Sequence, residues 1–338
     1  MNGRLRVAVL GALATSVLVL GGCSSDGGDG RGGAGGGRPE VVASTNVWGS
    51  VVSAVAGPDA DVTSIVTDPA ADPHSYESSP ADAAAVIDAD LVVFNGGGYD
   101  EFVEKILAGD PGKPTVEAVA LLPDSASDPS TDPASDPASE SAPESAERDE
   151  HSHGDGHDHG HDHGSVNEHV WYDVATAGAV ADRVATELGT LDPANADGYR
   201  ERAATFRAQL GAINAITTRI ATEHPGARVV QTEPIAHYLL LRAGLTDVTP
   251  PEFSNGVENE TDPPPAAIAA TRDLLTSHTV RALVWNTQTQ DRVTEDMRAV
   301  ATGAGVPVVE VTETLPAGDD YIAWLTANAT SLETALAQ

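Results

Sequence analysis

From residue 40 onward, the chain alternates between two patterns of hydrophobic positions. Short runs of consecutive apolar residues, such as Leu91–Phe94, are typical of strands buried on both faces. Between them lie segments with apolar side chains at helical spacing, and Ser79 followed by Pro80 is a typical helix start. We expect strands at 41–43, 61–66, 91–94, 228–230, 281–285 and 308–311, and helices at 48–55, 80–89, 100–107, 175–188, 234–243, 263–275, 293–303 and 321–336. This alternation predicts an α/β fold with parallel sheets.

One expected helix is much longer than the others. Its apolar positions recur at helical spacing from Asp192 to about Glu223, where Pro225 and Gly226 end it. One set of strands and helices precedes this helix and a second set follows it. The pattern therefore predicts two lobes with parallel sheets, an N-terminal lobe at 40–191 and a C-terminal lobe at 225–338, joined by one long helix at 192–224.

The hydrophobic pattern is interrupted inside the first lobe. Residues 123–150 contain Pro, Ser and acidic residues in a loose repeat, and 151–164 read HSHGDGHDHGHDHG. A segment with so few apolar side chains cannot bury a core, so we interpret 123–165 as a disordered acidic and His-rich insertion.

The first 39 residues carry a targeting signal. Arg4 and Arg6 precede a short apolar run, which ends in Leu20-Gly21-Gly22-Cys23. This order indicates a signal peptide at 1–22, and the last four residues resemble a bacterial lipobox, in which the cysteine is lipidated. Residues 23–39 would then form a flexible Gly/Ser tether. The prediction is a lipid-anchored, extracytoplasmic protein; the alternative is an ordinary signal peptide with a chance cysteine.

Composition excludes several functions. The chain has 51 acidic and 18 basic side chains, a formal net charge of −33, which disfavours binding to nucleic acid and favours cations. With a single cysteine, Cys23, there can be neither an internal disulfide nor a cysteine zinc cluster. No segment after the signal peptide is apolar enough to cross a bilayer.

Histidine is the residue that points to metal chemistry, because imidazole is a common metal ligand. Six of the eleven histidines belong to the tract in the insertion: His151, His153, His157, His159, His161 and His163. Of the others, His224 and His278 stand at expected helix ends and are interpreted as solvent-facing. His74 and His169 instead lie in loops at the edge of an α/β lobe, where ligands bind in such sheets. A loop histidine is often simply solvated, so position alone leaves both interpretations open.

The segments around these two histidines resemble a known family. DPHSYESSP, which contains His74, and NEHVWYD, which contains His169, resemble the metal-ligand motifs of the cluster A-I solute-binding proteins of zinc and manganese ABC importers. The resemblance runs from about Val41 to the C-terminus. It implies two Rossmann-like lobes joined by a rigid helix, with a metal site in the cleft between them. It also implies a monomeric, non-enzymatic protein that hands its metal to a membrane permease and the associated ATPase.

The resemblance also implies the remaining ligands. The third ligand of the family begins the first helix of the second lobe, which corresponds to Glu233, and His237 one turn later is an additional candidate. The fourth is commonly an Asp after the last strand, where this chain has Glu313 instead. Two imidazoles and two carboxylates suit Zn²⁺ and also Mn²⁺.

The His-rich tract favours zinc, because zinc-type members of the family often carry such a loop between the first two ligands. Its glycines and charges indicate loose, exchangeable binding, so we expect the tract to collect zinc and the rigid site to lie between the lobes. The expected function is therefore capture of Zn²⁺ for an ABC importer. A manganese-specific protein of the same family is one alternative, and a secreted zinc metallohydrolase is another, although the sequence lacks HExxH and GxSxG motifs. Adhesion, a role assigned to some relatives, has no supporting repeat.

Overall fold

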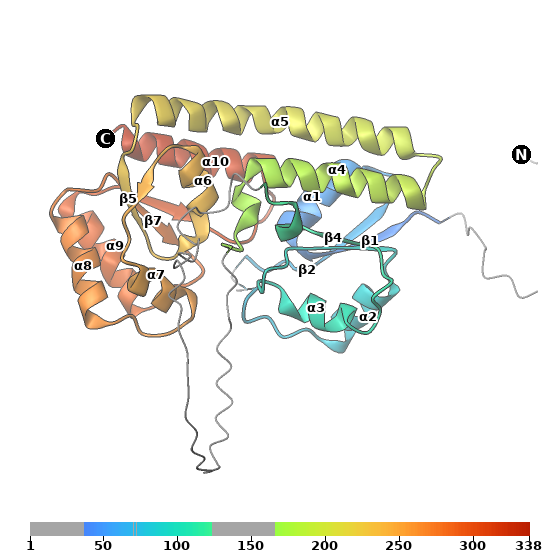
Figure 1. The fold of residues 1–338 in the computed structure, drawn as a ribbon, viewed down its shortest axis with the longest axis horizontal. Coiled ribbons are helices and arrows are strands. Elements are labelled where there is room, and N and C mark those ends of the chain that lie inside the picture. Colours follow the sequence, from blue (N-terminus) through green and yellow to red (C-terminus); the bar gives the residue numbers. More distant parts are fainter. Residues whose placement is uncertain (1–36, 70, 72, 124–165) are drawn as a thin grey trace, which may run out of the picture. The chain divides into compact units, whose positions relative to one another are not determined.

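The computed structural model describes residues 37–69, 71, 73–123 and 166–338, and its ribbon is drawn in Figure 1. Two four-stranded parallel sheets form its centre, with strand orders β2-β1-β3-β4 and β6-β5-β7-β8. The strands are β1 (Glu40–Thr45), β2 (Asp61–Val66), β3 (Leu91–Phe94), β4 (Thr115–Glu117), β5 (Arg228–Gln231), β6 (Thr246–Asp247), β7 (Leu283–Asn286) and β8 (Val308–Val311). Both sheets place their strands in the same order, and the predicted parallel α/β fold is confirmed.

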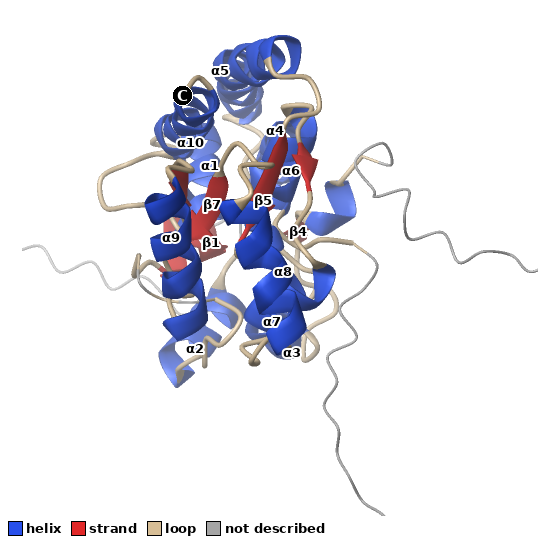
Figure 2. Ribbon diagram, turned by 90° about the vertical axis from the view of Figure 1, so that its left-hand side faces the viewer, coloured by secondary structure: helices blue, strands red, loops and turns tan. Residues whose placement is uncertain are grey.

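The register of each sheet follows from its central apolar strands. In the first sheet, Val41 of β1 pairs with Val62 of β2 on one side and with Leu91 of β3 on the other. In the second, β7 pairs with β5 and β8, and its residues Leu283–Asn286 are all buried. Strands buried on both faces need helices on both sides. Figure 2 shows the strands among the helices that cover them.

The helices of the described residues connect successive strands. They are α1 (Asn46–Ala56), α2 (Pro80–Asp88), α3 (Glu101–Leu107), α4 (Val174–Leu191), α5 (Ala196–Glu223), α6 (His237–Arg242), α7 (Pro251–Glu258), α8 (Pro265–Thr276), α9 (Arg292–Ala304) and α10 (Tyr321–Leu336), with short 3-10 turns at Val119–Leu121, Val170–Tyr172 and Pro234–Ala236. The start of α2 has a clear local cause. Ser79 caps α2 in a capping box with Asp82 and has Pro80 at the first helical position, as the sequence predicted.

The long helix α5 spans 28 residues but begins at Ala196, four residues later than predicted. The carboxylate of Asp192 accepts hydrogen bonds from the Asn195 amide at 2.6 Å and the Tyr199 hydroxyl at 3.1 Å. These bonds hold residues 192–195 as a turn between α4 and α5, because a short acidic side chain competes with helical backbone bonds. The two helices are therefore separate, and α4 packs along α5.

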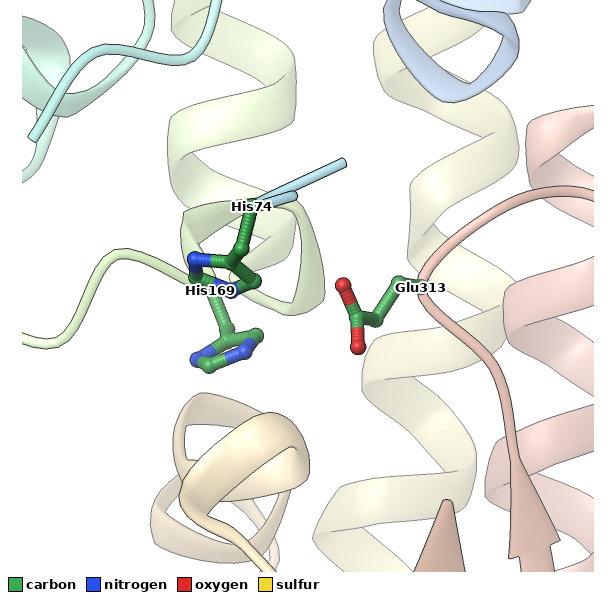
Figure 3. A group of neighbouring side chains, drawn as sticks. All are labelled: His74, His169 and Glu313. Carbon is green, nitrogen blue, oxygen red and sulfur yellow. The ribbon is translucent and has the colours of Figure 1, made fainter. Parts of the chain in front are cut away.

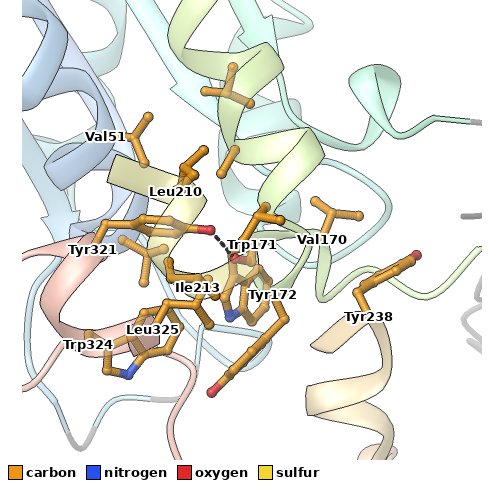
Figure 4. Close-up of a cluster of buried hydrophobic side chains, with 14 of the residues drawn as sticks. Val51, Val170, Trp171, Tyr172, Leu210, Ile213, Tyr238, Tyr321, Trp324 and Leu325 are labelled. Carbon is orange, nitrogen blue, oxygen red and sulfur yellow. Dashed lines mark hydrogen bonds between the residues drawn. The ribbon is translucent and has the colours of Figure 1, made fainter. Parts of the chain in front are cut away.

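The two sheets are joined by more than the chain that passes through α5. Residues Arg38–Gln338 form one compact unit. Its largest hydrophobic cluster contains side chains from both halves, including Trp171 before α4, Ile213 of α5 and Leu325 of α10 (Figure 4). The Tyr321 hydroxyl donates a hydrogen bond of 2.6 Å to the backbone oxygen of Trp171. A shared core of this kind fixes the position of one sheet against the other.

Two short strands and one short α-helix were not predicted. The strands β4 and β6 contain only three and two residues, too few to show a hydrophobic period. Helix α7 was missed because prolines and polar residues obscure its apolar face, which consists of Phe253 and Val257 at helical spacing. Among the described residues, no helix is both long and apolar enough to span a membrane.

Candidate metal centre

The predicted ligands follow the carboxyl ends of strands in both sheets. His74 lies in the loop after β2, and His169 follows the insertion after β4. Glu233 comes directly after β5, and Glu313 directly after β8. Since the carboxyl ends of parallel strands share one edge of a sheet, this topology gathers polar side chains from each sheet at one edge.

His169 has the most constrained geometry of these residues. Its side chain is 1% exposed, and its backbone N–H donates to the Oδ1 of Asn167 at 2.9 Å. The ring nitrogen Nδ1 lies 3.1 Å from the same amide oxygen, which can only accept, so Nδ1 carries the hydrogen. The lone pair is then on Nε2, which has no hydrogen-bond partner among the described residues. Such a fixed tautomer is typical of metal-binding imidazoles.

Burial keeps this imidazole neutral. The pKa of His169 lies well below its ordinary value, first because burial disfavours the charged ring and then because His74 and His237 add positive potential when protonated. Metal binding requires the neutral form of the ring. His169 is therefore ready to bind a cation at pH values at which a solvent-exposed histidine would be partly protonated.

His74 and Glu313 face His169 from opposite halves of the protein (Figure 3). The ring centroids of the two histidines are 5.9 Å apart, and Tyr99 contacts His74 edge-on at 4.7 Å. One ligand atom from each of His74, His169 and Glu313 lies within 4.8 Å of the other two. The structure thus brings together three of the four predicted ligands.

Hydrogen bonds hold the Glu313 carboxylate in place. The Tyr99 hydroxyl donates to Oε2 at 3.2 Å, and the Asn286 side-chain amide donates to Oε1 at 2.8 Å. The Glu313 backbone N–H donates to the side-chain oxygen of Gln288 at 2.5 Å. Donors from both halves therefore converge on one buried carboxylate.

Glu233, the fourth predicted ligand, belongs to the same hydrogen-bond network as Glu313. Its carboxylate is not part of the close group of potential metal ligands formed by His74, His169 and Glu313. The Asn286 amide donates to Glu233 Oε1 as well as to Glu313, and the Thr289 hydroxyl donates to Glu233 Oε1 at 2.8 Å. Asn286 thus links the two carboxylates. His237, the additional candidate, begins α6 and is close enough to influence the His169 pKa, yet it belongs to no group of potential metal ligands among the described residues.

Two carboxylates that sequence reasoning did not single out also reach the site. Glu258, the last residue of α7, places its Oε1 3.6 Å from His169 Nε2 and 3.9 Å from His74 Nε2. Glu168, buried beside His169 in the chain, forms a second close group with His74 and Glu258. The only signal for Glu258 in the sequence was its place at the end of a segment whose helical period was weak.

The neighbouring acidic groups raise the proton affinity of Glu258. The pKa of Glu258 lies well above its ordinary value, mainly because burial disfavours the charged form and further because Glu233, Glu168 and Glu313 are nearby. Several carboxylates gathered in a buried site give it a negative potential when they are ionised. A divalent cation would compensate this charge, whereas an anion would be repelled.

The remaining predicted positions contribute nothing to this centre or cannot be placed. His224 and His278 lie at the ends of α5 and α8, and neither belongs to a group of potential metal ligands among the described residues. Cys23 and the six tract histidines lie outside the described residues. The described centre consists of imidazole nitrogens and carboxylate oxygens, a donor set that both zinc and manganese accept.

Comparison with known families adds an independent finding. The model of the family described as "Zinc-uptake complex component A periplasmic" (ZnuA) matches residues 41–335. The manganese-binding lipoprotein MntA of Halalkalibacterium halodurans is 32% identical over 96 residues, which are 27% of this chain. That match spans 32% of the relative's length, about a third.

Solved structures share the fold at low identity. The protein FpvC of Pseudomonas aeruginosa, solved with Mn²⁺, has a TM-score of 0.65 and 22% identity, covering 89% of this chain and 99% of its own. The periplasmic zinc-binding protein TroA of Treponema pallidum has a TM-score of 0.67 and 18% identity, covering 89% and 100%. The laminin-binding adhesin Lmb of Streptococcus agalactiae, as a mutant, has a TM-score of 0.65 and 22% identity, covering 89% and 100%.

Proposed function

The chain belongs to the family of periplasmic zinc-uptake component A, and we propose that it captures a divalent metal ion outside the cytoplasm and delivers it to an ABC permease with its ATPase. The observation that carries this proposal is the close group of His74, His169 and Glu313. These ligands come from both halves of the protein, so a cation bound there would be held between the two sheets. Glu233 completes the proposed set through a small side-chain movement within the Asn286 network.

Zn²⁺ is the proposed cargo, with Mn²⁺ as the alternative. The order of metal affinities favours zinc over manganese for any set of nitrogen and oxygen ligands. The tract of six histidines, proposed as an accessory loop that binds zinc weakly, supports zinc. The names of the similar proteins include both metals, which agrees with a donor set that accepts either.

The proposed location is the outer face of the cell membrane. The lipobox-like segment ending in Cys23 supports a lipid anchor at that residue, and MntA, which shares 32% identity over part of its length, is named a lipoprotein. We propose that the protein acts as a monomer, with the permease as its partner.

A secreted zinc hydrolase remains the competing function. A catalytic zinc keeps one position open for water and needs a general base nearby. The proposed site instead surrounds the ion with protein ligands, and the chain contains no HExxH or GxSxG motif. A metal-bound water in place of Glu313 in a loaded structure would favour the hydrolase.

Thermal unfolding with and without metal tests the proposed function. A ligand that binds only the folded state stabilises it by RT ln(1 + [L]/Kd), about 4 kcal/mol at a thousandfold excess over Kd. Wild type should show this stabilisation with Zn²⁺, while His169→Ala and Glu313→Ala should lose most of it. His278→Asn is the matched control, because it removes an exposed histidine whose left-handed backbone (φ 54°) asparagine tolerates. Equal stabilisation in all four proteins would refute the proposed site.

A further inference from the structure

We propose that Glu258 is a further ligand of the bound metal, and that its carboxylate determines how well the site holds ions that prefer more than four ligands. The inference rests on the proposed function, because it concerns the same cation. It assigns a role to α7, which follows β6 in the second half of the protein.

The distances around Glu258 are close to those of ligands that share an ion. Glu258 Oε1 lies 3.6 Å from His169 Nε2 and 3.9 Å from His74 Nε2. A hydrogen bond between nitrogen and oxygen measures about 2.7–3.2 Å, so neither separation is a hydrogen bond. Two ligand atoms, each about 2.1 Å from a common metal, are about 3.0–3.6 Å apart when the angle between them is about 90–120°. The separation from His169 falls within this range, and the separation from His74 lies just beyond it, so a small movement of the Glu258 side chain would bring its carboxylate onto an ion that His169 holds.

One buried atom of each of these two side chains, Glu258 and His169, lacks a hydrogen-bond partner among the described residues. The side chain of Glu258 is 10% exposed and that of His169 is 1% exposed. Glu258 Oε2 and His169 Nε2 both lack a hydrogen-bond partner among the described residues. Buried polar atoms without partners are costly, and such atoms in native proteins call for an explanation. A cation coordinated by both side chains would satisfy them together.

Packing of α7 fixes the position of Glu258. Phe253 and Val257 of the same helix are buried in the hydrophobic cluster of the second sheet. Gly256 lies against Pro263 so closely that an added Cβ would stand 2.9 Å from the proline Cα. The backbone before Glu258 is therefore held tightly, and the carboxylate can approach the ion only over the reach of its own side chain.

An additional carboxylate changes which metals the site prefers. Zinc is satisfied by four ligands in a tetrahedral arrangement. Manganese favours oxygen donors and a larger, octahedral set of ligands. With His74, His169, Glu313 and Glu233 as the first four ligands, Glu258 supplies a fifth donor. Its removal should therefore weaken Mn²⁺ binding more than Zn²⁺ binding.

Competition titrations against a chelator, with Mn²⁺ and Zn²⁺, test the inference on the full chain. The variants are Glu258→Gln and Glu258→Ala, and Glu252→Gln is the matched control, because Glu252 is an exposed acid in the first turn of α7. Loss of a group that only supports a ligand costs about 10–100-fold in affinity. Loss of the ligand itself should weaken Mn²⁺ binding by at least about 100-fold, whereas Zn²⁺ binding should fall by less than about tenfold.

A spectroscopic measurement separates coordination from simple loss of charge. Bound Co²⁺ absorbs visible light more strongly as its coordination number falls, so the Glu258→Gln spectrum should intensify relative to wild type and Glu252→Gln. Equal weakening of Mn²⁺ and Zn²⁺ with an unchanged Co²⁺ spectrum would overturn the inference, as would unchanged affinities. If Glu258→Ala does not fold, the similarly sized Gln variant decides. Retention of both affinities in Glu258→Gln, combined with their loss in His169→Ala, would refute only this inference; absence of metal binding in wild type would refute the proposed function.

Discussion

Replacement of Asn286 by Ala tests the network that positions two carboxylates of the second half, Glu233 and Glu313. This buried amide donates to Glu313 Oε1 at 2.8 Å and to Glu233 Oε1. It does not need to touch the metal itself, so the substitution leaves every proposed ligand in the chain. Its effect should appear as weaker metal binding, because the two carboxylates lose the donor that holds them side by side.

The expected magnitude follows from the number and kind of bonds that are lost. A hydrogen bond to a charged group contributes about 1.5–3 kcal/mol, and part of this is recovered when water reaches the vacated space. Outer partners of metal ligands typically change affinity by about 10–100-fold, which is about 1.4–2.7 kcal/mol. We therefore expect Asn286→Ala to lower the metal-induced stabilisation by about 1.4–2.7 kcal/mol at saturating Zn²⁺.

The assay compares urea unfolding with and without Zn²⁺ in wild type, Asn286→Ala and Asn328→Ala. Asn328 is the matched control, because it is also a buried amide but its side chain donates to the Tyr172 hydroxyl, at 3.4 Å, rather than to a carboxylate. The control reveals how far general destabilisation affects metal binding. If Asn286→Ala retains the full zinc-induced stabilisation, the amide does not position ligands and the reasoning is refuted.

Three other predictions concern separate parts of the chain. Cys23→Ser should release the protein from membranes in a fractionation assay, because lipid chains are its proposed anchor; sedimentation of the variant with membranes would contradict this. Replacement of residues 123–165 by a short Gly-Ser linker should leave one tight Zn²⁺ site and remove several weak ones in calorimetric titration; loss of the tight site would contradict the division of roles. Asp100→Asn should remove a pH-dependent loss of folding stability. Burial raises the pKa of Asp100 from 3.8 to about 6, although the backbone N–H groups of Asn95 and Gly96 partly oppose the shift. The folded state therefore holds a proton that the unfolded state releases above about pH 4, so wild type loses about 3 kcal/mol of stability as the pH rises towards 6. In urea titrations, the variant should gain that amount relative to wild type between pH 3.5 and 7.5. A stability difference that stays constant with pH would contradict the raised pKa.

The sequence predicted the elements whose stability depends on local pattern. Leu91–Phe94 had to be a buried strand because four consecutive apolar side chains need cover on both faces, and Ser79 with Pro80 defined the start of α2. By contrast, the start of α5 depended on side-chain bonds of Asp192, which the hydrophobic period does not show. The fold class was therefore accessible from the sequence, whereas one of its helix boundaries was not.

The sequence predicted only part of the candidate site, because some of its residues come together only through the packing of distant segments. His74 and His169 stand in distinctive loop segments, and the structure places them near Glu313, as expected from the family resemblance. The contribution of Glu258 depends on how α7 packs against the second sheet. The residues that neighbour Glu258 in the sequence do not predict this packing. The same holds for Asn286, because its role arises from two carboxylates that are far from it in the chain.

Crystals of the protein loaded separately with Zn²⁺ and Mn²⁺, with anomalous diffraction at each metal edge, test the central claim most directly. The account predicts one strong peak between the two sheets, bonded to His169 Nε2 and to a carboxylate oxygen of Glu313, with His74 and Glu233 as further ligands. A strong peak that touches neither His169 nor Glu313, or the absence of any ordered metal between the sheets at saturating concentration, would contradict it.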